Sequence, residues 1–135
     1  QYFNPQSKIV VIVISSRNSS DLKNIGKSLS GVLQRLRPDA LVVASSDMTH
    51  HESQASANRK DKIAIDELLA LNEDSLYSKV HAMHITMCGI YPAVTMLVCA
   101  KDRGAKKAEL VRYETSGDIT GDYDHVVGYA GIIIS

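Results

Sequence analysis

Hydrophobic and polar positions divide the first third of the chain into two apolar runs separated by an amphipathic stretch. KIVVIVI at residues 8–14 and ALVVAS at residues 40–45 are unbroken and rich in β-branched side chains. Such runs predict strands that are buried on both faces of a sheet covered by helices. Between them, apolar residues recur at helical spacing from Asp21, with Ser20 as the expected N-cap and Pro38 beyond the end. The order predicts a βαβ unit with a right-handed crossover.

The remaining two thirds predict three more helices and two more strands. We expect helices from about Ser53 to Leu71, over NEDSLYSKV, and from near Pro92 to a stop at Gly104. KAELVRYETS and HVVGYAGIII have strand character and flank the turn-rich SGDITGDYD. The sequence therefore predicts a single α/β domain over residues 1–135, with a central, mostly buried β-sheet flanked by helices.

One carboxylate interrupts the apolar stripe of the helix expected from Ser53. Asp61 lies between Ala57 and Ala64, at positions that share one helical face. An unpaired carboxylate is costly to bury. We therefore expect Asp61 to lie at the margin of the stripe or to pair with a neighbour.

Composition and charge limit which binding partners and which cellular location we expect for this protein. Fifteen basic and fifteen acidic side chains cancel and are scattered, which argues against nucleic acid or an anionic membrane as the main partner. No apolar run approaches the roughly 20 residues of a membrane span, and QYFNPQSK has no signal-peptide pattern. Cys88 and Cys99 are eleven residues apart in an expected turn and helix, too far to bridge easily. A reducing, cytoplasmic location is expected.

Protonatable groups are concentrated where the second apolar run ends. SSDMTHHE, residues 45–52, presents Asp47 and His50 three residues apart. In open α/β sheets ligands bind outside the carboxyl ends of strands, and a carboxylate beside an imidazole can orient a proton relay or bind a metal. The alternative is that Ser46 or Asp47 caps the next helix and that the histidines are exposed. Spacing leaves both interpretations open.

A second cluster, HAMHITMCGIYP, contains His81, His84 and Cys88. The spacing is a weak zinc pattern, because a structural zinc site needs four ligands and no C-x-x-C is present. The alternative is two exposed histidines and a cysteine packed as a small hydrophobe. A Cys88 nucleophile with His50 as its base also stays open. Cys99 is expected in the core, and serine-hydrolase, P-loop and dinucleotide motifs are absent from the sequence.

Three ordered motifs resemble one known family. SSDMTHHE, then MCG followed by Pro92, then RYETSGDITGDYDHVVGYAGI are similar to the C-terminal half of the Memo family. Prokaryotic members of that family are called protein B of the AmmeMemoRadiSam system, and the resemblance implies a fold similar to class III extradiol ring-cleaving dioxygenases. QYFNPQ resembles the segment that follows the N-terminal half, and the chain lacks an initiator Met. The sequence thus looks like the C-terminal part of a larger domain whose N-terminal half is missing.

The resemblance implies roles for three residues. Cys88 corresponds to a metal ligand that replaces a carboxylate of the dioxygenases, and two histidines of the missing half would complete the set. Asp47 and His50 match residues lining the same pocket, where the relatives place an acid/base histidine. Met48 and His51 depart from the aromatic residues more usual there, so the pocket wall is expected to differ, and His81 and His84 match no functional position.

The implied cofactor is a transition metal: copper, iron or zinc. Thiolate in place of carboxylate favours copper(I) or zinc and holds an oxygen-activating iron(II) less securely, so ring cleavage does not transfer with the resemblance. The leading hypothesis is a metal-dependent, dioxygenase-related oxidoreductase acting on a small molecule or peptide in the pocket. The alternative is a non-catalytic peptide- or protein-binding module. A third hypothesis, drawn from the family's grouping, is a shared pathway with radical-SAM and AMMECR-type proteins.

Overall fold

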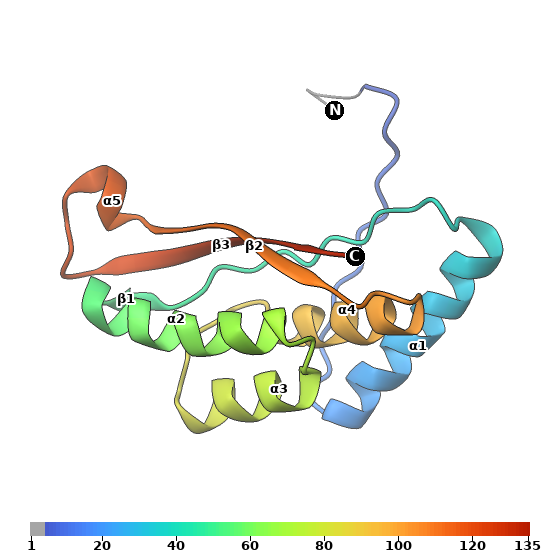
Figure 1. Ribbon diagram of the computed structural model, residues 1–135, viewed down its shortest axis with the longest axis horizontal. Coiled ribbons are helices and arrows are strands. Elements are labelled where there is room, and N and C mark those ends of the chain that lie inside the picture. The colour runs from blue at the N-terminus through green and yellow to red at the C-terminus, as the bar shows by residue number, and fades with distance from the viewer. Residues whose placement is uncertain (1–4) are drawn as a thin grey trace.

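The longer helices lie on one side of a small sheet (Figure 1). The structure is a computed structural model that describes residues 5–135. Its elements are α1 (Ser19–Leu36), β1 (His50–Glu52), α2 (Gln54–Leu69), α3 (Glu73–Ala82), α4 (Ile90–Asp102), β2 (Ala108–Thr115), α5 (Gly117–Thr120) and β3 (Val126–Ile134). The expected α/β class is confirmed.

The sheet has three strands in the order β1-β3-β2, and both pairings are antiparallel. β2 and β3 form the long pair, in which Tyr113 lies opposite Ala130, whereas β1 pairs only with the start of β3. Four of the eight residues of β2 are exposed and only one is buried. The prediction of a mostly buried central sheet is therefore wrong for the described residues, because the longer helices lie on one side only (Figure 1).

The two apolar runs at residues 8–14 and 40–45 are not strands in this structure. They run as irregular chain, and their side chains are largely exposed; the large ones above half exposure are Ile9, Val10, Val11, Ile12, Val13, Leu41 and Val43. A β-branched run favours extended backbone, but a strand exists only when a neighbour accepts and donates its main-chain hydrogen bonds. Residues 5–135 supply no such neighbour. The predicted βαβ unit is wrong for that reason.

The predicted helices are confirmed with small changes at their ends. Ser53 caps α2 through its hydroxyl, which accepts from Ser56 N–H, and Asn72 caps α3 in the same way. Asn18, not Ser20, caps α1, because its side-chain oxygen accepts from the main-chain N–H groups of Ser20 and Asp21. Both residue types are good N-caps, so the sequence alone does not decide between them.

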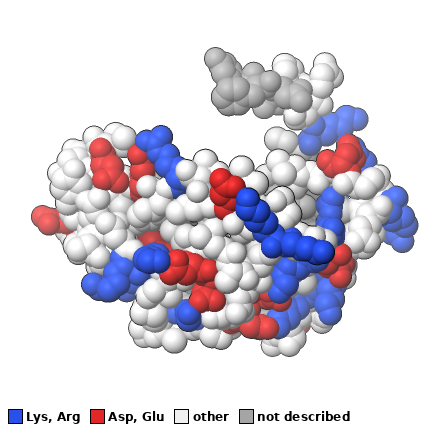
Figure 2. Space-filling view, in the orientation of Figure 1, with Lys and Arg blue, Asp and Glu red and all other residues white. Residues whose placement is uncertain are grey.

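The core lies between the helices and on the helix-facing side of β3. α1 packs mainly on α4, and α2 packs on β2 and β3. Fully buried side chains include Leu22, Leu76, Val94 and Leu97, and Cys99 is buried with them as expected. Within residues 5–135, no helix has the length and apolar character needed to cross a bilayer. Figure 2 shows basic and acidic side chains interspersed over the visible face, which agrees with the scattered charge of the sequence.

Candidate functional site

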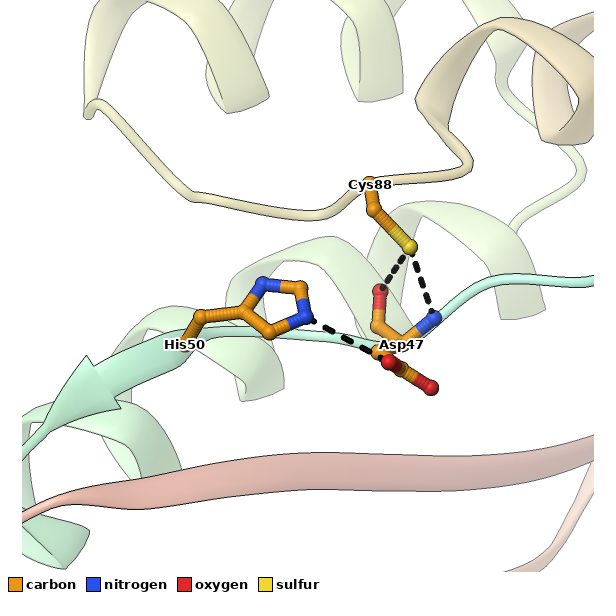
Figure 3. A group of neighbouring side chains, drawn as sticks. All are labelled: Asp47, His50 and Cys88. Atoms are coloured by element: carbon orange, nitrogen blue, oxygen red, sulfur yellow. Dashed lines mark hydrogen bonds and ion pairs between the residues drawn. The ribbon is translucent and has the colours of Figure 1, made fainter.

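Three side chains from two distant segments meet beside the start of β1. Asp47 and His50 come from the segment that enters β1, and Cys88 comes from the turn before α4 (Figure 3). One carboxylate oxygen, one imidazole nitrogen and the thiol sulfur all lie within 4.8 Å of one another. Among the described residues, this is the single group of three or more such side chains that could hold a metal ion.

The turn that carries Cys88 is fastened directly to the segment that carries Asp47. The Asp47 N–H donates to Cys88 Sγ over 3.1 Å, and the Gly89 N–H donates to Ser46 Oγ over 2.8 Å. A Cβ on Gly89 would lie 2.4 Å from Ser46 Cβ and 2.5 Å from the main-chain oxygen of Ser45. Only glycine therefore lets the M-C-G turn lie this close, and that approach brings Cys88 to Asp47.

Thr86 holds His50 at both its main chain and its ring. The His50 N–H donates to Thr86 Oγ1 over 2.7 Å, and His50 Nδ1 lies 2.8 Å from the main-chain oxygen of Thr86. A carbonyl oxygen only accepts, so this contact assigns the proton to Nδ1. In the neutral ring Nε2 then carries the free lone pair, and it is Nε2 that faces Asp47 and Cys88 (Figure 3).

His50 Nε2 lies 3.4 Å from Asp47 Oδ2. A lone pair and a carboxylate oxygen repel each other at that distance unless a proton or a cation lies between them. The pair is partly accessible, with 24% of the His50 side chain and 48% of the Asp47 side chain exposed. This arrangement suits either proton transfer at Nε2 or joint binding of a metal ion.

The donor set is compatible with a borderline or soft transition metal. Imidazole nitrogen, carboxylate oxygen and thiolate sulfur all bind zinc, and neighbouring ligand atoms on tetrahedral zinc lie about 3.3–3.8 Å apart. The observed separations of up to 4.8 Å require only a small inward movement of exposed side chains. A sulfur ligand favours copper(I) and zinc over magnesium or calcium.

A β-bulge lies next to the site, and the two residues that follow His50 do not join it. The register of β1 on β3 shifts between His50 and Glu52, and His51 has a φ of 57°. Glu52 instead accepts hydrogen bonds from Lys60 Nζ at 2.6 Å and from Ser56 Oγ at 2.6 Å. These donors hold the pKa of Glu52 below its ordinary value. Glu52 is thereby tied to α2, and His51 is exposed.

The alternatives left open by the sequence are now decided in part. Ser53 caps α2, so the interpretation of Asp47 or Ser46 as that cap is wrong. His81 and His84 are exposed and do not join Cys88 in a described metal-binding group. His81 instead contacts the main-chain oxygen of Tyr77 through Nδ1. His81 and His84 are therefore exposed histidines, as the alternative to the zinc pattern predicts.

Two contacts of this site could not be expected from the sequence. Thr86 orients His50 although 36 residues separate them, and Ser46 bridges to the Cys88 turn across 43 residues. Neither a hydroxyl at a strand end nor a threonine in a turn is unusual. Their roles depend on tertiary contacts that periodicity does not report.

Comparison with known proteins places this sequence in a family. The Memo-like protein family matches residues 1–133. The chain belongs to the Memo-like family. It is 43% identical over 127 residues to a MEMO1 family protein of Methanocaldococcus jannaschii, covering 94% of this chain and 44% of that protein. It is 42% identical over 133 residues to a MEMO1 family protein of Aquifex aeolicus, covering 98% of this chain and 49% of that protein.

This chain matches only part of each Memo-like relative, so the match does not give the activity of the whole relative. The chain spans less than half the length of these curated relatives. The same is true of a MEMO1 family protein of Methanopyrus kandleri, to which the chain is 34% identical over 98% of this chain and 47% of that protein. Asp47, His50 and Cys88 thus lie in the part of these relatives' sequence that this chain matches.

Proposed function

We propose that this chain supplies part of a transition-metal site, with Cys88 as a metal ligand and His50, oriented by Asp47, as the acid/base group. The observation that carries the proposal is the convergence of Cys88 Sγ, one imidazole nitrogen of His50 and an Asp47 oxygen within 4.8 Å. Zinc or copper(I) fits a thiolate-containing set better than iron(II) does. The activity that follows is a metal-dependent oxidoreductase chemistry related to the dioxygenases.

The chain's own residues have distinct parts in this chemistry. Thr86 keeps the proton on His50 Nδ1, so that His50 Nε2 can accept a proton from a substrate and return it. Asp47 faces Nε2 and stabilises the imidazolium once the proton has moved. A bound metal would supply Lewis acidity or a site for small-molecule redox chemistry.

A hollow of about 300 Å³ gives a ligand room next to the site. It is lined by Ser46, Arg112, Glu114, Tyr129, Ala130 and Gly131. Ser46 also lies 4.0 Å from Cys88 Sγ, so the hollow adjoins the thiol. Arg112 and Glu114 form an ion pair at its wall. A small, polar substrate or a peptide end fits these surroundings.

We further propose that the chain is the C-terminal part of a larger Memo-like domain. Two observations support this: the relatives are more than twice as long as the matched region, and the apolar runs at residues 8–14 and 40–45 are exposed. Runs of this kind become strands when a neighbouring segment supplies main-chain hydrogen bonds. The further ligands of the metal would come from that segment.

The test is elemental analysis of the intact protein purified without oxygen, with Cys88→Ala, His50→Ala and His125→Ala measured in parallel. We expect near-stoichiometric metal in the unsubstituted protein, loss of metal in Cys88→Ala, and retention in His50→Ala with loss of turnover. His125 is an exposed histidine outside the group, so His125→Ala should leave both metal and turnover unchanged.

Two results would count against the proposal. Absence of metal from every form would remove the metal site and make the binding-module alternative the leading account. That alternative expects partner binding to survive both Cys88→Ala and His50→Ala. Equal metal content in the unsubstituted protein and Cys88→Ala would remove Cys88 from the ligand set while leaving the acid/base role of His50 to be measured.

A further inference from the structure

We propose that Asp61, which takes no part in the chemistry above, is a positioning residue that sets the geometry of Asp47 and His50. Its side chain is fully buried in the middle of α2. One carboxylate oxygen accepts from the Thr49 N–H over 2.9 Å, and the other accepts from the Tyr113 hydroxyl over 2.8 Å. Thr49 directly precedes His50. The proposal rests on the proposed function of the neighbouring residues.

The hydrogen bond to Thr49 acts at the centre of the functional segment. Met48 N–H donates to the Gly128 oxygen, and Gly128 N–H donates to the Thr49 oxygen, each over 2.9 Å. β3 therefore holds one side of this segment, and Asp61 holds the remaining main-chain donor, the Thr49 N–H. Asp61 and β3 together restrict the main chain of residues 48 and 49, and thereby the positions of Asp47 and His50 on either side.

Packing alone does not explain a carboxylate at this buried position. A buried carboxylate costs several kcal/mol of desolvation unless its partners compensate, and no ion pair to Asp61 occurs among residues 5–135. Its two donors are neutral: burial and the hydrogen bond to Asp61 both raise the pKa of Tyr113. Each carboxylate oxygen has one donor, and one of these two hydrogen bonds holds the Thr49 N–H.

A matched set of variants separates positioning from stability. Asp61→Ala removes the acceptor for Thr49. Asp61→Asn keeps one acceptor oxygen, and its amide can donate to the Tyr113 oxygen while Tyr113 donates to Asn58 Oδ1, which lies 3.2 Å away. Tyr113→Phe deletes the other hydrogen bond to Asp61 and leaves Thr49 held. Asp61→Glu keeps the charge but shifts the acceptor by one methylene.

The first readout is the tautomer of His50, measured from imidazole ¹⁵N–¹H NMR correlations in the metal-free intact protein. We expect the Nδ1–H form in the unsubstituted protein, in Asp61→Asn and in Tyr113→Phe. We expect a mixed population in Asp61→Glu and in Asp61→Ala. If Asp61→Ala does not fold, Asp61→Glu carries the test. A mixed population in the unsubstituted protein, or the Nδ1–H form in every folded variant, overturns the proposal.

The second readout is cobalt(II) binding, followed by the thiolate-to-cobalt absorption band. The Asp47 N–H donates to Cys88 Sγ, so a displaced Asp47 should disturb the sulfur ligand. We therefore expect roughly tenfold weaker binding in Asp61→Glu and Asp61→Ala, the lower end of the effect of supporting residues on metal affinity. Asp61→Asn and Tyr113→Phe should bind as the unsubstituted protein does. Absence of the band from the unsubstituted protein would count against Cys88 as a ligand, and the tautomer measurement would still decide the role of Asp61.

Discussion

Gly128 faces the Asp61 carboxylate so closely that no other residue fits in its place. A Cβ on Gly128 would lie 2.0 Å from Asp61 Oδ2 and 3.2 Å from Met48 Cβ. The glycine of β3 therefore determines how near α2 can come to the sheet. That distance in turn allows the Asp61 carboxylate to reach the Thr49 N–H.

Gly128→Ala should destabilise the protein by on the order of 2 kcal/mol, because overpacking a buried contact displaces its neighbours. Gly31→Ala is the matched control: it lies within α1, and its added Cβ would meet nothing within 4 Å. That change should stabilise the protein by about 0.5–1 kcal/mol through helix propensity. Denaturant unfolding of both variants measures the difference, and equal effects would contradict the close contact.

Thr86→Val should lower activity through His50 while the fold persists. Valine has the shape of threonine but offers no acceptor for the His50 N–H, and the loss of an exposed hydrogen bond of this kind costs about 0.5–1.5 kcal/mol. The ring contact to the Thr86 main-chain oxygen should loosen with it. Thr86→Ser retains the hydroxyl and should retain activity. Denaturant unfolding and turnover, measured together, test this, and equal turnover in Thr86→Val and Thr86→Ser would remove Thr86 from the site.

Local signals in the sequence were enough for the helices but not for the sheet. The apolar stripe of α2 depends on residues a few positions apart, so it is visible in the sequence. Strand formation in residues 8–14 depends on a partner strand, and β-branching alone predicts only extended backbone. The same limit applies to Asp61: its position on an apolar stripe was visible, but its partner Tyr113 is 52 residues away.

The site was predictable in its residue types and not in its geometry. Asp47 and His50 are close in sequence, and their pairing was one of the two interpretations that the spacing left open. The approach of Cys88 to Asp47 spans 41 residues and came only from the resemblance to the Memo family. The tautomer of His50 depends on Thr86, which no motif marks.

Alkylation should distinguish the two cysteines. Cys88 is exposed, whereas Cys99 is fully buried and burial raises the pKa of its thiol. Because the thiolate is the reactive form, iodoacetamide should label one cysteine per folded chain. Cys88→Ala should then take up no label until denatured, whereas Cys99→Ala should label as the unsubstituted chain does. Mass spectrometry counts the label, and rapid labelling of Cys99 in the folded chain would contradict the packing of α4.

The Glu52–Lys60 ion pair should contribute stability that depends on pH. Lys60 and then Ser56 lower the pKa of Glu52 from its ordinary 4.5. A lowered folded-state pKa gives stability that is complete above about pH 4.5 and is lost as the pH falls through the folded value. Glu52→Gln should therefore cost on the order of 1 kcal/mol at pH 7 and less at pH 3.

The matched control for Glu52 is Glu109→Gln. Glu109 pairs with Lys107 at 3.6 Å, but both side chains are largely exposed, so its loss should change the free energy of unfolding little at either pH. Urea unfolding at both pH values gives the comparison. A cost of Glu52→Gln that is equal at pH 7 and pH 3 would show that the charge of Glu52 is not responsible.

The exposed apolar runs should make the 135-residue chain associate when it is prepared alone. Val11 is 81% and Val43 is 76% exposed, and unpaired apolar chain of this kind readily pairs with another copy. Val11→Lys and Val43→Lys should each reduce association measured by sedimentation velocity. Ile119→Lys is the control, since Ile119 is 84% exposed but lies in α5, outside both runs. Cooperative unfolding of the unsubstituted chain as a monomer, with no dependence on concentration, would contradict the proposal that a further segment of a larger domain covers these runs.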